Sequence, residues 1–172
     1  MAVGLTACGD TNLNPFKADT IEVGCPSLGS LKEAETLTRF RPGTGRDLTD
    51  IMLQAKIGRV VGTCEVKQST LTGKVTLGVE LLGERGPALE IDMASLEYFV
   101  VIEAPNGEIA SREAFVLSMD FRKNVLETRA VDYLTFTIPN ASPEALRAYR
   151  VFVGLQMTRD EWDFSQRTRQ GR

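Results

Sequence analysis

Apolar and polar residues alternate with a period of two over several stretches of the chain. Successive side chains of a β-strand point to opposite faces, so this alternation predicts strands that turn one apolar face inward. One run, Tyr98–Ile102, is apolar throughout, and we expect it to be covered on both faces. The expected strands contain the stretches Ile51–Ile57, Val60–Lys67, Val75–Leu81, Phe115–Met119, Leu134–Ile138 and Tyr149–Leu155.

Turn-forming residues separate these stretches. Pro105-Asn106-Gly107 predicts a hairpin between the strands on either side, and Gly83–Pro87 is expected to end another strand. Ser142 followed by Pro143 predicts the start of a short helix, with serine as its cap. Ser30 and Glu33 have the spacing of a capping box, which predicts a second short helix over Leu31–Leu37.

About seven strands with regular turns and little helix predict an all-β fold, a two-sheet antiparallel sandwich with one or two short helical turns. An immunoglobulin-like or fibronectin-like sandwich is the first expectation, and a partly closed barrel is the alternative. We place the sandwich at residues 25–160. The remaining residues, 161–172, are expected to form a polar C-terminal tail, in which Trp162 and Phe164 cap the sandwich edge.

The composition of the chain argues against several classes of function. The chain has 172 residues, 42% of them apolar, and a net charge of -3, so no basic field favours nucleic acid as a partner. It contains no histidine, which removes the commonest general base and the commonest metal ligand. We therefore expect no enzymatic activity, no cofactor and no metal site.

The segment Leu5-Thr6-Ala7-Cys8 ends in small residues before a cysteine and is followed by a polar, turn-rich run. It resembles the lipobox of bacterial lipoproteins. The resemblance implies lipidation of Cys8, with residues 1–7 as a signal-peptide remnant and 8–24 as a lipidated, flexible tether. None of the residues before Cys8 is basic, so a full export signal would require residues upstream. The alternative is a free thiol in the tail of a cytosolic protein.

Two further cysteines, Cys25 and Cys64, remain once Cys8 is set apart. An even pair in an oxidising compartment favours a disulfide. Closing a loop of this size would stabilise the fold by about 4 kcal/mol in the chain-entropy model. The alternative is two buried free cysteines that pack as small apolar residues. A structural zinc site lacks its ligands, because there is neither a C-x-x-C motif nor a histidine.

The stretch from Arg39 to Asp50 concentrates charge and glycine. Arg41 and Arg46 could bind an anion, with Asp47 and Asp50 beside them. Alternatively, the aspartates cap turns and the arginines pair with them locally, and this structural interpretation is favoured. The two aspartates alone fall far short of the oxygen ligands that calcium needs.

Several stretches carry a wider resemblance. Together with Cys8, they are similar to a group of Gram-negative envelope lipoproteins to which no activity is assigned. The resemblance implies a protein of the bacterial cell envelope that is anchored by its lipid in the outer membrane, faces the periplasm and has an envelope protein as partner. A non-enzymatic binding or assembly module is the expected function; the alternative is a small-anion-binding or hydrolytic protein using the Arg39–Asp50 loop. The stretches are Leu37–Asp47, Arg85–Pro87 and Tyr98–Val101.

Overall fold

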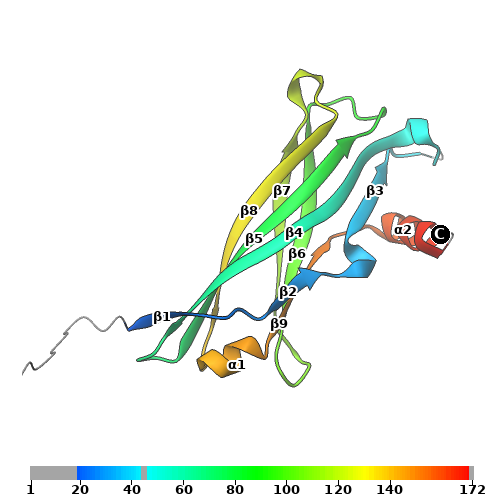
Figure 1. Cartoon of the computed structure of the whole chain (residues 1–172). Coiled ribbons are helices and arrows are strands. Elements are labelled where there is room, and N and C mark those ends of the chain that lie inside the picture. Colours follow the sequence, from blue (N-terminus) through cyan, green and yellow to red (C-terminus); the bar gives the residue numbers. More distant parts are fainter. Residues whose placement is uncertain (1–18, 44–45, 171–172) are drawn as a thin grey trace, which may run out of the picture.

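The computed structural model describes residues 19–43 and 46–170, which form a two-sheet β-sandwich (Figure 1). One sheet has five strands, namely β1 (Thr20–Val23), β3 (Thr36–Phe40), β4 (Ile51–Lys67), β5 (Thr72–Arg85) and β8 (Glu127–Ile138). The other sheet has four strands, namely β2 (Ser27–Ser30), β6 (Met93–Glu103), β7 (Ile109–Asp120) and β9 (Arg150–Leu155). The expected all-β sandwich is therefore confirmed.

Each sheet includes neighbouring strands that are far apart in the chain. The first sheet runs β4-β5-β8 and the second β7-β6-β9, so two of the pairings join strands distant in the chain. Both β1 and β3 pair with β4, along different parts of its length. One pairing differs from the expectation of purely antiparallel sheets, because β2 lies parallel to β9, with Ser27 opposite Arg150.

The core lies between the sheets and is built from the inward residues of the alternating stretches. On β4 the alternation is interrupted by an irregularity between Ile57 and Val60, where the pairing with β5 shifts. The backbone N–H of Arg59 donates there to the Glu80 carboxylate, at 3.1 Å. This bulge explains why two separate strands were expected where the structure has one long strand, β4.

The apolar run on β6 is buried on one face only. Tyr98, Val100 and Ile102 are buried in the core, whereas Phe99 and Val101 are half-buried on the other face. The expectation that both faces are covered is therefore wrong. Phe99 is partly covered by the guanidinium of Arg112, which lies 4.8 Å from its ring centroid.

The turn predictions have mixed outcomes. Gly107 has φ +85°, which glycine adopts readily, and it turns the chain from β6 into β7 as expected. The backbone N–H of Ala145 donates to the Ser142 hydroxyl at the start of helix α1 (Pro143–Arg147), also as expected. The helix expected over Leu31–Leu37 is wrong: only a 3₁₀ turn, η1 (Lys32–Ala34), forms, because the following residues pair with β4 as β3.

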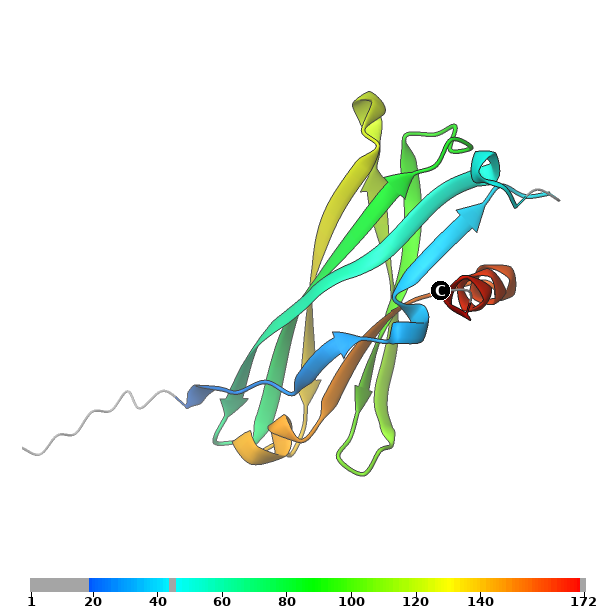
Figure 2. The same cartoon turned by 45° about the vertical axis from the view of Figure 1, so that its right-hand side comes forward.

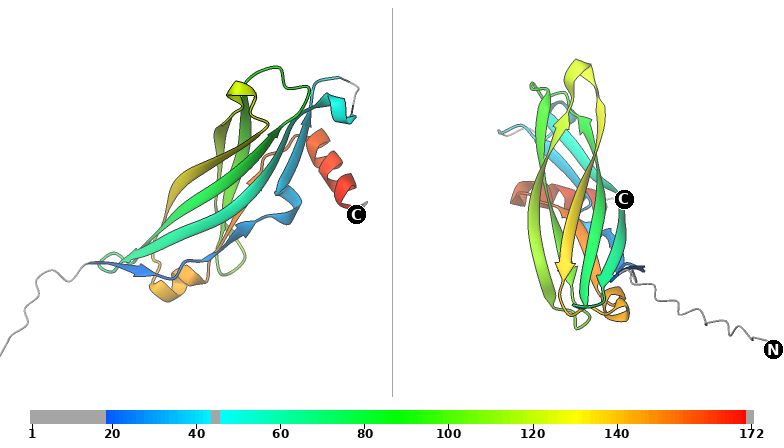
Figure 3. Two further views of the ribbon diagram at one scale, coloured as in Figure 1. Left: turned by 45° about the horizontal axis from the view of Figure 1, so that its top comes forward. Right: turned by 90° about the vertical axis from the view of Figure 1, so that its left-hand side faces the viewer.

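Both ends of the folded region lie beyond the expected boundaries. Residues 20–23, placed in the tether from the sequence, form β1 and pair with β4. The polar residues 159–170, expected to belong largely to a tail, form helix α2 (Arg159–Gln170). Figures 2 and 3 show α2 outside the sandwich, next to β3. Short 3₁₀ turns, η2 (Leu48–Asp50) and η3 (Arg122–Asn124), complete the described elements.

No helix in residues 19–43 and 46–170 is both long and apolar enough to cross a membrane.

Candidate functional site

The cysteine pair forms a disulfide. Cys25 follows β1 and is joined to Cys64 on β4, with the two Cα atoms 5.2 Å apart. The expected bridge is thus present, and it ties the segment after β1 to β4 near the last residues of that strand. Cys8, the expected lipidation site, lies outside the described residues.

The loop that carries Asp47 is built around its own hydrogen bonds. The backbone N–H and the hydroxyl of Thr49 donate to Oδ1 of Asp47, at 2.8 and 2.6 Å. These two bonds hold the pKa of the Asp47 carboxyl below its ordinary value, and the bond from the Thr49 hydroxyl has the larger effect. Asp50 is only 3% exposed, and its Oδ1 lies 2.5 Å from Nη2 of Arg41. Both aspartates therefore serve as caps of η2.

Arg46 is directed away from these residues and toward α2. Its Nη2 atom lies 3.3 Å from Oδ2 of Asp160, and its guanidinium stands 5.3 Å from the ring centroid of Phe40. Arg41, Arg46, Asp47 and Asp50 are thus engaged with one another or with α2, and none of them lines the large cavity described below. This geometry favours the structural interpretation of the loop.

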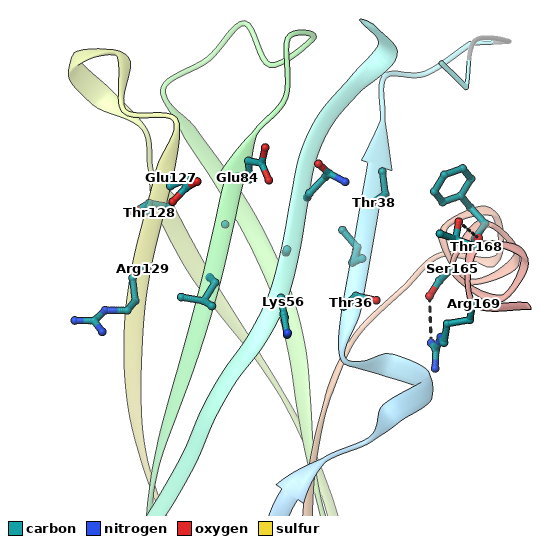
Figure 4. A pocket seen from close by; sticks show the side chains of 16 residues that line it. Thr36, Thr38, Lys56, Glu84, Glu127, Thr128, Arg129, Ser165, Thr168 and Arg169 are labelled. Carbon is teal, nitrogen blue, oxygen red and sulfur yellow. Dashed lines mark hydrogen bonds between the residues drawn. The ribbon is translucent and has the colours of Figure 1, made fainter. Parts of the chain in front are cut away.

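A groove of about 700 Å³ lies on the outer face of the first sheet, bounded on one side by α2 (Figure 4). It crosses β3, β4, β5 and β8 at one level, because residues opposite one another in the strand pairing share a face. The outward side chains form two rows. The first row is Thr36, Lys56, Leu82 and Arg129, and the second is Thr38, Gln54, Glu84 and Glu127.

The helix α2 supplies the wall of the groove with Phe164, Ser165, Thr168 and Arg169. The helix begins at a capping box, in which the backbone N–H of Thr158 donates to Oε2 of Glu161 at 2.8 Å and that of Glu161 donates to the Thr158 hydroxyl at 3.3 Å. Three contacts hold α2 beside β3 and η1. Arg39 Nε donates to Glu161 at 2.7 Å, the rings of Phe40 and Phe164 meet at 4.9 Å, and Arg169 donates to the carbonyls of Lys32 and Glu33.

The two rows carry opposite charge. Arg129 is paired with Glu80, at 3.1 Å, and the pKa of Glu80 is lowered first by the Arg59 backbone N–H and then by the charges of Arg59 and Arg129. Within the described part of the chain, no ion pair engages Lys56, Glu84 or Glu127. The two glutamates lie directly opposite one another on β5 and β8, an arrangement of like charges that destabilises a sheet.

The chemistry available in the groove is that of recognition. The lining offers hydroxyl and amide groups, the ammonium of Lys56 and the carboxylates of the second row, with the ring of Phe164 at the side. Among the residues that the structure describes, no three histidine, cysteine or acidic side chains gather as metal ligands.

Sequence reasoning missed this groove. The alternation does identify Gln54, Lys56 and Glu84 as outward positions, but four neighbouring strands must align before the rows exist. One short sequence pattern did indicate the helix that forms the groove wall, namely the capping-box spacing of Thr158 and Glu161 at its start.

Comparison of the chain with protein-family models, with curated proteins and with solved structures found no match.

Proposed function

We propose that this protein is a lipid-anchored, periplasm-facing envelope lipoprotein that acts as a binding or assembly module and catalyses no reaction. In this proposal the groove between α2 and the outer face of the first sheet contacts an envelope partner. The groove is the observation that carries the binding role, because its volume falls within the range of about 300–1,000 Å³ typical of ligand sites.

The placement of the groove relative to the N-terminal end supports the proposal. The chain enters the sandwich through β1, in which Val23 lies opposite Cys64. The groove crosses the same strand, β4, at Gln54 and Lys56. At about 3.3 Å per residue, the two points are separated by roughly 30 Å along β4. A lipid on Cys8 would therefore hold the domain at one end and leave the groove accessible at the other.

The anchor is tested in the native cell. Wild-type protein is expected in the membrane fraction, with a mass increased by acyl chains, whereas a Cys8→Ser variant is expected in the soluble periplasmic fraction without added lipid. The mass of the membrane-extracted protein decides the matter. An unmodified wild-type Cys8 thiol, or equal membrane retention of the variant, would overturn the anchor.

The role of the groove is tested by mild cross-linking in the same cells, followed by recovery of cross-linked envelope components. A Gln54→Trp substitution fills the groove floor from an exposed position and is expected to abolish the cross-link. Thr63→Trp is the matched control, since it lies on the outward face of the same strand but outside the groove. Equal recovery with both variants would show that the partner binds elsewhere.

A further inference from the structure

The charged side chains of the groove indicate which kind of ligand it binds. Lys56 contributes an ammonium from β4, and Glu84 and Glu127 contribute adjacent carboxylates from β5 and β8. All three side chains are exposed, and within the described residues none of them has an ion-pair partner. A ligand that brought charge of both signs would therefore meet groups whose charge is not already neutralised by the protein.

The spacing of these charges defines the ligand. Lys56 lies directly opposite Leu82, so Glu84 is its diagonal neighbour on the next strand. Diagonal positions in an antiparallel pair are about 7–8 Å apart. An extended peptide advances about 3.3 Å per residue, so its terminal ammonium and carboxylate reach this separation in a chain of two or three residues.

The two opposed glutamates, Glu84 and Glu127, favour a ligand that carries a cation at one of its ends. Their carboxylates lie directly opposite one another and repel, which costs stability in the unoccupied groove. A ligand ammonium between them removes that repulsion. Of the other groove cations, Arg129 is engaged by Glu80 and Arg169 donates to the carbonyls of Lys32 and Glu33, so we assign the ligand carboxylate to Lys56. The arrangement is therefore selective for a ligand with a positive and a negative end.

We propose that the groove binds a short zwitterionic peptide, with its ammonium at Glu84 and Glu127 and its carboxylate at Lys56. Such a peptide is the chemical class of the envelope component that the groove recognises. This inference rests on the proposed function only in taking the groove as the binding surface. It requires neither the lipid nor a membrane.

The test uses the full chain with Cys8→Ser and four probes: trialanine with free ends, its N-acetyl derivative, its C-terminal amide and the doubly blocked peptide. Isothermal titration is expected to show saturable binding of trialanine. Blocking either end is expected to weaken binding about tenfold, as for the loss of one charge-assisted contact. Absence of saturable trialanine binding, or equal binding of all four peptides, would overturn the proposal.

Variants assign each end of the peptide. Lys56→Gln is expected to make the free acid and the amide bind equally, while N-acetylation still weakens binding. Glu84→Gln combined with Glu127→Gln is expected to give the reverse result. Lys74→Gln is the control, because Lys74 lies on the outward face of β5 but outside the groove and pairs with Glu65. Circular dichroism confirms that each variant is folded.

The two proposals can fail separately. If trialanine does not bind but the envelope cross-link still depends on Gln54, the binding role of the groove stands and the peptide inference is wrong. If trialanine binds with the expected dependence on its ends and Cys8 carries no lipid, the anchor is wrong and the peptide inference stands.

Discussion

Tyr98 shows how one side chain can link the two sheets. It lies on β6 in the second sheet and is fully buried, and its hydroxyl donates to Oδ2 of Asp132 on β8 at 2.7 Å. Its ring stacks on that of Phe115, with the centroids 5.4 Å apart. Burial, together with the Asp132 carboxylate, raises the pKa of Tyr98, so the phenol keeps the proton that it donates.

Removing that hydroxyl is expected to cost stability. Tyr98→Phe leaves the Asp132 carboxylate without its donor between the sheets, and we expect the free energy of unfolding to fall by about 1–3 kcal/mol. Urea denaturation measures the loss. Tyr133→Phe is the control, because this side chain is 75% exposed and should change stability by less than about 0.5 kcal/mol. Equal losses in the two variants would mean that the bond to Asp132 contributes nothing.

At the scale of elements, the sequence predicted those strands and turns whose formation depends on residues close together in the chain. The strands β4, β5, β7, β8 and β9 were predicted because each turns an alternating apolar face to the core, and the β6–β7 turn because Asn106 and Gly107 favour it. The short strands β1, β2 and β3 were not predicted, because none of them is long enough to show that alternation. The helix α2 was missed because its sequence is strongly polar; its position depends on contacts such as Arg39 with Glu161, which join residues far apart in the chain. The groove depends on both strand alignment and α2, so no short stretch of sequence encodes it.

The ion pair between Arg39 and Glu161 is expected to hold α2 on β3. Glu161→Gln keeps the shape of the side chain but removes its charge, and we expect a loss of about 2 kcal/mol. Hydrogen exchange should show α2 amides losing more protection than those of β5. Asp160→Asn is the matched control, because Asp160 is exposed and its pair with Arg46 lies at the surface. Protection of α2 that is unchanged by Glu161→Gln would contradict this role.

At the scale of the whole molecule, the disulfide closes the largest covalent loop that the described residues contain. It joins positions separated by 39 residues, and between them lie β2, β3 and most of β4. The sequence predicted this pairing because the lipobox resemblance set Cys8 apart and left two cysteines in a compartment expected to be oxidising. It could not predict that Cys64 sits on the strand that β1, β3 and β5 all pair with.

Replacing both cysteines by alanine is expected to lower the free energy of unfolding by about 4 kcal/mol, from the entropy that the loop gains in the unfolded chain. For a chain of this size, the melting temperature should fall by about 10 °C. Calorimetry under non-reducing conditions measures the change. Wild-type protein unfolded in the presence of a reductant should melt near the double variant, and a difference of less than about 2 °C between oxidised wild type and variant would contradict the expectation.

The position of the disulfide has a mechanical consequence. Tension applied to the N-terminal end reaches β1 first and can peel its residues Thr20–Val23 from β4, breaking their hydrogen bonds one after another. Peeling stops at Cys25, where the load passes through a covalent bond to Cys64 on β4, a strand that stays paired with β5 on its other side. A pulling force can therefore lengthen the chain by a few residues before it meets the resistance of the whole sheet.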